Sequence, residues 1–316
     1  MIPALDEVMV EDTAGDPVSG LKWTHKSLRK IQTSLDKEGY SISPPTISRL
    51  LQECDYSLQV NHKRIAGKQF PGRDAQFHYI GRWRQVYLLR GWPVISVDSK
   101  KRELIGNFKN PGRAWRQKRR EVNMYDFPSL AQGKAIPYGI YDIGRNQGFV
   151  SVGISHNTPE FAVAAIRSWW LTIGQTAYPS QKHLLIEADC GGSNGNRSRV
   201  WKMGLQRLVD EFGLIITVTH YPTGASKWNP IEHRMFNLIS ANWAGEPLDS
   251  YEMIINHIRT TTSTTGFRCQ AQLDTTQYEL QKKVSNKDFE TLHIRPHKRF
   301  PHWNYTVYPR IPKPDV

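Results

Sequence analysis

The sequence predicts an α/β fold with a mixed sheet, and three features lead to this prediction. An apolar run ends in a carboxylate at Asp98, two further apolar runs flank a short turn, and helical and strand patterns then alternate. Three early strands with an antiparallel pair, followed by alternating helices and strands, are typical of the RNase H-like topology, and they fit a doubly wound parallel sheet less well. The predicted strands are 94–98, 138–143, 149–154, 183–189 and 214–219, and the predicted helices run from 158 to about 173, from the glycine-rich turn at 191–195 to about 212, and onward from 229.

A pair of short helices is predicted ahead of this sheet. Apolar residues recur at helical spacing from Leu28 to Leu35, and Gly39 supplies a stop. Ser43 followed by Pro44 is a typical start for the next helix, because it places an N-cap residue before a proline at the first helical position. The pattern favours a helix-turn-helix segment, and a helical hairpin without a role in binding remains the alternative.

The second of these helices is the candidate DNA-reading element. Its apolar face contains Ile47 and Leu50, whereas Thr46, Ser48 and Arg49 are expected to project outward. Small polar and basic side chains on the exposed face of the second helix are what a helix-turn-helix presents to DNA. These three residues are therefore predicted to contact DNA.

The domain organisation follows from changes in composition along the chain. The predicted parts are a poorly ordered lead-in at 1–20, a helix-turn-helix-like segment at 21–57, a linker and helix at 58–92, an RNase H-like catalytic domain at 93–262 and a basic C-terminal extension at 263–316, for which no secondary structure is assigned.

The balance of charge points to a polyanion as partner. The 316 residues include 42 Lys and Arg against 29 Asp and Glu, which gives a net charge of +13. Nucleic acid is the commonest partner of such a surface, although a basic enzyme without such a partner would have the same composition. Residues 100–120 alone contain nine Lys or Arg and one Glu, so this segment is a candidate contact for DNA or for a second copy of the chain.

Other protein classes are disfavoured. No apolar run approaches the roughly 18 to 20 residues needed to span a bilayer, and the first residues lack a signal-peptide pattern. The three cysteines, Cys54, Cys190 and Cys269, are far apart and odd in number, which argues against a disulfide framework or a paired-cysteine zinc site. We expect a cytoplasmic protein associated with the nucleoid.

Three acidic residues are the candidate catalytic groups. Asp98 and Asp189 end predicted buried strands, and Glu232 lies in the first turn of the helix after the fifth strand. Active sites gather at the carboxyl ends of such strands, and in the RNase H-like topology the first and fourth strands are neighbours. Converging carboxylates need a compensating cation, and their hard oxygens suit Mg²⁺, with Mn²⁺ as a substitute. A pair of such ions about 3.5–4 Å apart supports in-line displacement at phosphorus.

Each acid also has a structural alternative. Asp98 and Asp189 are residues that often close a turn after a strand. Glu232 stands three positions after Asn229, which would form a capping box with it at the start of a helix. The acids taken singly therefore do not decide between catalysis and capping.

A resemblance decides it. The stretch from Tyr221 to Glu232, YPTGASKWNPIE, resembles the third motif of mariner-like and related insertion-sequence transposases, in which the glutamate completes a metal-binding triad. More closely, the chain resembles the Rhodopirellula-type DDE transposases, bacterial insertion-sequence enzymes of the retroviral-integrase superfamily. The resemblance extends from about Gly15 to Pro309. The matching stretches are Val94–Trp115, Ala135–Asp142, Leu185–Gly195, Ser226–Phe236, Asn242–Pro247 and Trp303–Pro309.

This resemblance implies an enzyme that cuts DNA at the ends of its element and joins those ends to target DNA. Asp98, Asp189 and Glu232 would be both the catalytic residues and the ligands of two divalent ions. Double-stranded DNA would be the partner, and two chains would act together because two ends must be paired. The further candidate DNA contacts are Lys100, Lys101, Arg113, Lys227, Trp228 and Arg234, with a solvated basic face, or core packing for Trp228, as the alternatives.

Two departures from the family pattern bear on this expectation. Cys190 stands where a glycine is expected, which would narrow the site. The family's additional helix-turn-helix sequence would precede the stretch that starts here near Asp6, so the chain is expected to be an amino-terminally shortened version. A DNA-binding relic or regulator of transposition without cleavage activity is therefore an alternative function. A nuclease acting on RNA·DNA hybrids is a further alternative.

Overall fold

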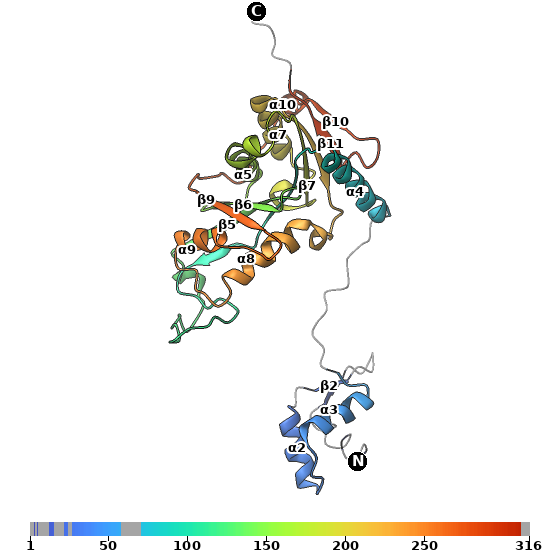
Figure 1. The fold of residues 1–316 in the computed structure, drawn as a ribbon, viewed down its shortest axis with the longest axis vertical. Helices are drawn as coiled ribbons and strands as arrows, with labels where there is room; N and C mark the ends of the chain where they lie inside the picture. The colour runs from blue at the N-terminus through green and yellow to red at the C-terminus, as the bar shows by residue number, and fades with distance from the viewer. Residues whose placement is uncertain are drawn as a thin grey trace, which may run out of the picture. The chain divides into compact units, whose positions relative to one another are not determined.

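The chain forms two compact units, which are considered separately. The computed structural model describes residues 27–57 and 71–310, together with Pro3, Leu5 and the backbone of two short strands (Figure 1). The units are Met1–Ala66 and Gly67–Val316. Most of the predicted lead-in and residues 58–70 of the predicted linker lie outside the described residues.

The first unit contains the two predicted helices, α2 (Leu28–Lys37) and α3 (Pro44–Glu53). Ile31, Leu35 and Ile47 are fully buried between them, which explains the spacing of apolar residues in both segments. The two helices are therefore confirmed as a packed pair. The unit also contains the antiparallel strands β1 (Thr13–Gly15) and β2 (Lys22–Thr24).

The second unit is built on a mixed sheet. Its strands lie in the order β10-β11-β8-β7-β3-β5-β6-β9, and β4 pairs with β5. Strands β3, β7 and β8 are parallel, whereas β5 is antiparallel to both β3 and β6. This central arrangement is the RNase H-like order and confirms the predicted fold class. The strands are β3 (Val94–Ser99), β4 (Glu103–Ile105), β5 (Gly133–Asp142), β6 (Gln147–Gly153), β7 (His183–Ala188), β8 (Ile215–His220), β9 (Arg268–Asp274), β10 (Ile294–Pro296) and β11 (Asn304–Val307).

Helices cover both faces of this sheet (Figure 1). Helices α5 and α7 pack on one face, and α4, α8 and α9 pack on the other. None of the described helices is long and apolar enough to cross a membrane. The helices are α4 (Arg73–Leu89), α5 (Pro159–Trp169), α6 (Gln175–Ala177), α7 (Arg199–Phe212), α8 (Asn237–Asn242), α9 (Tyr251–Arg259) and α10 (Asn286–Glu290). Shorter turns are η1 (Pro128–Leu130), η3 (Gly192–Asn194) and η4 (Ser226–Trp228), and the π-helical turns are η2 (Trp170–Gly174) and η5 (Glu232–Phe236).

The alternation of side chains along β3 decides where its carboxylate lies. Ile95 and Val97 belong to the core beneath α5 and α7. Because successive side chains of a strand point to opposite faces, Ser96 and Asp98 lie on the face covered by α8 and η5. The acid at the end of the strand is thereby placed on the same side as Glu232.

Residues 263–310 complete both edges of the sheet. Strand β9 runs parallel to β6 at one edge, and β11 runs antiparallel to β8 toward the other, where β10 follows it. These strands are not predictable from the local pattern, because β9 has only Cys269 and Ala271 as buried apolar positions. Much of this segment therefore belongs to the body of the second unit.

Candidate active site

The sheet brings Asp98 and Asp189 to the same edge. Val97 of β3 and Ala188 of β7 are direct partners in the parallel pairing. Asp98 follows Val97 in the chain, and Asp189 follows Ala188. Glu232 is the first residue of η5. All three carboxyl groups are partly buried. Segments separated by 91 and 43 positions in the sequence thus supply three acids to one region of the molecule.

Asn229 ties these three segments together. Its side chain is fully buried, and its Nδ2 donates hydrogen bonds to the carbonyl oxygen of Val97 at 3.1 Å and to Oδ1 of Asp189 at 3.3 Å. Its Oδ1 accepts a 2.5 Å hydrogen bond from the hydroxyl of Ser96, and that hydroxyl in turn accepts one from the backbone N–H of Ile231. One amide therefore connects β3, the residue after β7 and the start of the turn that carries the glutamate.

The capping alternative for Glu232 is not what the structure shows. The backbone N–H of Asn229, which a capping box would pair with the glutamate, donates instead to the carbonyl oxygen of Ser226 at 2.8 Å. Within residues 71–310 the carboxylate of Glu232 forms no hydrogen bond or ion pair. It begins a π-helical turn, a local irregularity that is frequent at functional sites.

The turn η5, which begins at Glu232, packs closely against the sheet. Gly139 of β5 pairs directly with Asp98, and a Cβ atom at Gly139 would lie 2.3 Å from Cε of Met235 and 2.6 Å from Cε1 of Phe236. Both of those residues belong to the same turn as Glu232. Glycine at this position therefore allows the glutamate and the aspartate to approach one another.

This close approach gives a first prediction. Replacing Gly139 with alanine is expected to displace the turn that carries Glu232 and to lower stability by about 1–3 kcal/mol through overpacking. It should also lower the DNA strand cleavage that the sequence predicts. Removing the opposing side chain in the double variant Gly139→Ala/Met235→Ala should restore part of both. Chemical unfolding and a cleavage assay measure the two effects, and a Gly139→Ala variant with unchanged cleavage would contradict this account.

A buried relay fixes the backbone of Asp189. The carbonyl oxygen of Asp189 accepts a 2.8 Å hydrogen bond from Nδ1 of His220, which leaves Nε2 to accept from the hydroxyl of Tyr305 at 3.4 Å. That hydroxyl accepts a 2.9 Å hydrogen bond from the indole of Trp201. Burial lowers the pKa of His220 to about 4, so the imidazole is neutral and the tautomer is set by the carbonyl.

The pKa values of all three acids are raised. Burial and the nearby charge of Asp189 raise the pKa of Asp98 to about 8. Burial raises the pKa of Asp189 to about 6, with the hydrogen bond from Asn229 opposing it and the charge of Glu232 adding to it. Burial also raises the pKa of Glu232, against the influence of His233 and Lys100. The three groups therefore sense one another as like charges, and a cation would relieve the repulsion.

This electrostatic strain predicts how stability depends on pH without divalent ions. The folded protein keeps a proton on Asp98 between about pH 4 and 8, where the unfolded chain has lost it, so stability falls as pH rises through that window. Asp98→Asn cannot ionise, and its stability advantage over the parent should grow to the order of 2 kcal/mol at pH 8.5. Chemical unfolding at pH 5 and pH 8.5 in EDTA checks this, and an equal difference at both pH values would refute it.

One protein family matches nearly the whole chain. Residues 4–309 match the family described as Rhodopirellula transposase DDE domain. The chain belongs to this transposase family. No curated protein matches the chain.

Some solved structures are also similar to this member of the transposase family. The Mos1 transposase paired-end complex with left transposon end shares 14% identity at a TM-score of 0.42, and a pre-cleavage Mos1 transpososome shares 13% at 0.43. Each match covers 80% of this chain and 68% of the other. Similarity at this level carries no conclusion about the site.

The residues of the second unit that were predicted to contact DNA differ in how exposed their side chains are. Lys100 is only 12% exposed, pairs with Glu103 at 3.1 Å and lies 4.6 Å from the ring of Trp243. Trp228 is 56% exposed, which argues against core packing. The cation of Lys227 lies 5.4 Å from its ring. The exposed basic candidates are Lys101, Arg113, Lys227 and Arg234.

The candidates in the first unit lie on α3. Arg49 is exposed and lies 3.8 Å from Glu53, while Thr46 and Ser48 are partly exposed. Ser43 is the N-cap residue of α3 with proline after it, as the sequence predicted, and its hydroxyl pairs with that of Thr46 at 2.9 Å. The outward placement expected for Arg49 agrees with the structure, and its contact with DNA stays a prediction.

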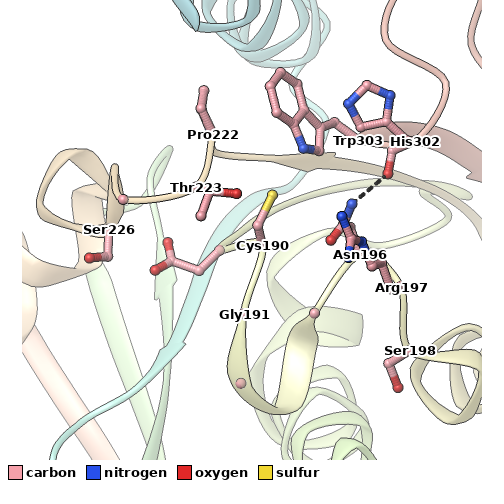
Figure 2. A pocket seen from close by; sticks show the side chains of 14 residues that line it. Cys190, Gly191, Asn196, Arg197, Ser198, Pro222, Thr223, Ser226, His302 and Trp303 are labelled. Atoms are coloured by element: carbon pink, nitrogen blue, oxygen red, sulfur yellow. Dashed lines mark hydrogen bonds between the residues drawn. The ribbon is translucent and has the colours of Figure 1, made fainter. Parts of the chain in front are cut away.

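A cavity of about 670 Å³ opens beside Asp189 (Figure 2). It is lined by residues of the 189–198 loop, the 222–226 loop and the pair His302–Trp303. Burial raises the pKa of the Cys190 thiol to about 12, so this departure from the family pattern places a neutral thiol in the wall. Only the glycine-rich pattern of 191–195 signalled this loop in the sequence.

Proposed function

We propose that the chain is a transposase that cuts DNA at the ends of an insertion sequence and joins those ends to target DNA, with Asp98, Asp189 and Glu232 holding Mg²⁺ or Mn²⁺. The observation that carries this proposal is the set of hydrogen bonds formed by the buried Asn229 side chain, called here the Asn229 bridge, which joins the segments of all three acids. If the three acids only ended two strands and began a helical turn, the fold would not need a buried side chain that joins all three segments.

The donor set suits a hard divalent ion. Three carboxylates supply only oxygen ligands, and burial together with mutual repulsion raises the pKa of each. As they stand, no three acidic, imidazole or thiol groups among the described residues are grouped closely enough to hold one ion. Glu232 is the ligand with room to adjust, because no described hydrogen bond holds its carboxylate and its turn is π-helical.

The proposed reaction has two phosphoryl-transfer steps. Water first attacks the scissile phosphorus, which breaks the P–O3′ bond and leaves a 3′-hydroxyl and a 5′-phosphate. That hydroxyl then attacks a phosphorus of the target strand and displaces its 3′-oxygen. Bound divalent ions, which we propose to be two, supply activation of the attacking oxygen and stabilisation of the leaving one. Asn229 and the His220 relay keep Asp189 in place during both steps.

Double-stranded DNA is the proposed partner. The net charge of +13 and the exposed cations of Lys101, Lys227 and Arg234 support it. We propose that residues 21–57 recognise DNA and that residues 93–262 carry the chemistry. A homodimer follows from the need to pair two element ends, and a cytoplasmic, nucleoid-associated location follows from the substrate.

The test uses a plasmid that carries the gene with its flanking DNA. Purified protein with Mn²⁺ should cut at discrete flanking sites, and both EDTA and Asp98→Asn should prevent cutting. Binding of the flanking DNA without cleavage would favour a regulator of transposition. Preference for RNA·DNA hybrids over duplex DNA would favour a hybrid-specific nuclease, and absence of both binding and cleavage would reject the assignment to DNA.

A further inference from the structure

We propose that the cavity beside Asp189 receives one unpaired nucleotide of the DNA strand that is being cut. This proposal rests on the proposed transposase function and adds a specific subsite to it. The ligand class is a deoxynucleotide still linked in its strand, lifted out of the double helix next to the scissile phosphate.

The position of the cavity supports a nucleotide of the reacting strand. Asp189, a proposed metal ligand, forms part of its lining. Cys190, the next residue in the chain, and Thr223 line it as well (Figure 2). A nucleotide in this space is therefore adjacent to the phosphate on which the acids act. His302 and Trp303, from the loop before β11, complete the lining.

The size of the cavity supports a whole nucleotide. Its volume of about 670 Å³ lies in the range of pockets that enclose a small organic molecule. A phosphate alone would leave most of the space empty, whereas a double helix is far too wide to enter. A base with its sugar and phosphate is the part of a DNA strand that matches this space.

The lining offers both parts of a nucleotide suitable partners. The exposed Arg197 and the glycine-rich backbone that leads to the start of α7 suit a phosphate. The Cys190 thiol is hydrogen-bonded with Thr223 and Trp303, and these residues together with His302 form a mixed polar and apolar wall against which a base can lie. This mixture is what a nucleotide requires and what a bare anion does not.

The wall is held in place before any ligand arrives. Nδ2 of Asn196 donates a 3.0 Å hydrogen bond to the carbonyl oxygen of His302, which joins the 189–198 loop to the loop before β11 (Figure 2). The rings of His302 and Trp303 lie 4.6 Å apart, and Trp303 is buried. A preformed cavity lowers the ordering cost of binding.

Gly191 offers a way to fill the cavity without disturbing the fold. It lines the space, is exposed, and has an ordinary extended backbone with φ of −116°. A Cβ atom there would meet nothing within 4 Å. Gly191→Phe therefore places a ring at the cavity, while Gly191→Ala is the matched control that leaves nearly all of the volume open.

The probe is duplex DNA from a mapped cleavage site, with 2-aminopurine at one position on either side of the scissile bond. Before divalent metal is added, the parent protein should raise the fluorescence several-fold at one position, because the base leaves the stack. Gly191→Phe should abolish this rise and slow cleavage at least about tenfold, with affinity for the duplex changed less than about twofold. Gly191→Ala adds only a methyl group, so it should slow cleavage and reduce the fluorescence rise far less than Gly191→Phe does.

A second pair of variants tests whether Arg197 binds the phosphate of the unpaired nucleotide. Arg197→Ala should reduce the fluorescence rise, whereas Arg268→Ala, which removes an exposed arginine from the far edge of the sheet, should not. Duplex that is bound and cut without a fluorescence rise at any position would overturn the subsite alone, as would normal cleavage by Gly191→Phe. Failure of the parent protein to cut DNA would overturn the proposed function itself.

Discussion

Glu232→Gln is expected to remove DNA strand cleavage almost completely while leaving the fold intact. The carboxylate forms no hydrogen bond or ion pair within residues 71–310, so an amide of the same shape breaks no contact described there. The amide cannot supply the negative charge that an ion requires. A loss on the order of 1,000-fold or more is expected in cleavage rate, measured with Mg²⁺ on plasmid DNA.

Glu252→Gln provides the matched control for this prediction. Glu252 is an exposed glutamate in the first turn of α9, so the substitution and its helical setting are similar. It should cut DNA as the parent does. Glu232→Gln should also lose the stabilisation against heat that Mn²⁺ gives the parent, because a missing ligand weakens ion binding. Cleavage by Glu232→Gln within about tenfold of the parent rate would reject the role of this residue.

Asn229→Ala is expected to damage both stability and cleavage. It removes hydrogen bonds to Val97, Asp189 and Ser96, and it leaves buried polar groups without their partner. With about 1 kcal/mol for each hydrogen bond and a further cost for the unpaired groups, the free energy of unfolding should fall by about 2–4 kcal/mol. Cleavage should fall about 100-fold, because the amide positions an acid and does not itself meet the DNA.

The control here is Asn256→Ala, an exposed position on α9 where alanine favours the helix. Its unfolding and its cleavage should match those of the parent. A positioning role for Asn229 also predicts that more Mn²⁺ is needed for half-maximal cleavage, which a general loss of stability would not cause at a temperature where the variant is folded. An unchanged metal requirement together with unchanged cleavage would show that the bridge is only structural.

The sequence predicted the central sheet because its signals are local. The strand expected at 94–98 is observed at Val94–Ser99, and the strand expected at 183–189 is observed at His183–Ala188. Each is a short apolar run that ends in a carboxylate, so both its burial and its end can be recognised from neighbouring residues. The family assignment is likewise confirmed, whereas the roles of the three acids stay predictions.

The parts that the sequence did not predict depend on contacts between distant residues. Asn229 has the local appearance of a helix N-cap, but its partners lie 40 to 133 positions away. The relay from Trp201 through Tyr305 to His220 joins residues 85 and 104 positions apart, and no spacing rule marks them. Strand β11 was missed for the same reason, because its pairing with β8 is what makes it a strand.

The position of β11 in the chain has a consequence for synthesis on the ribosome. The three acids and β8 emerge before residues 304–307, so the nascent chain carries the acids while β8 still has an unpaired edge. Tyr305 has then not yet reached His220, and the backbone of Asp189 lacks its support. DNA cleavage should therefore begin only after β11 has been translated. Incomplete nascent chains would then not cleave the gene from which they are being made.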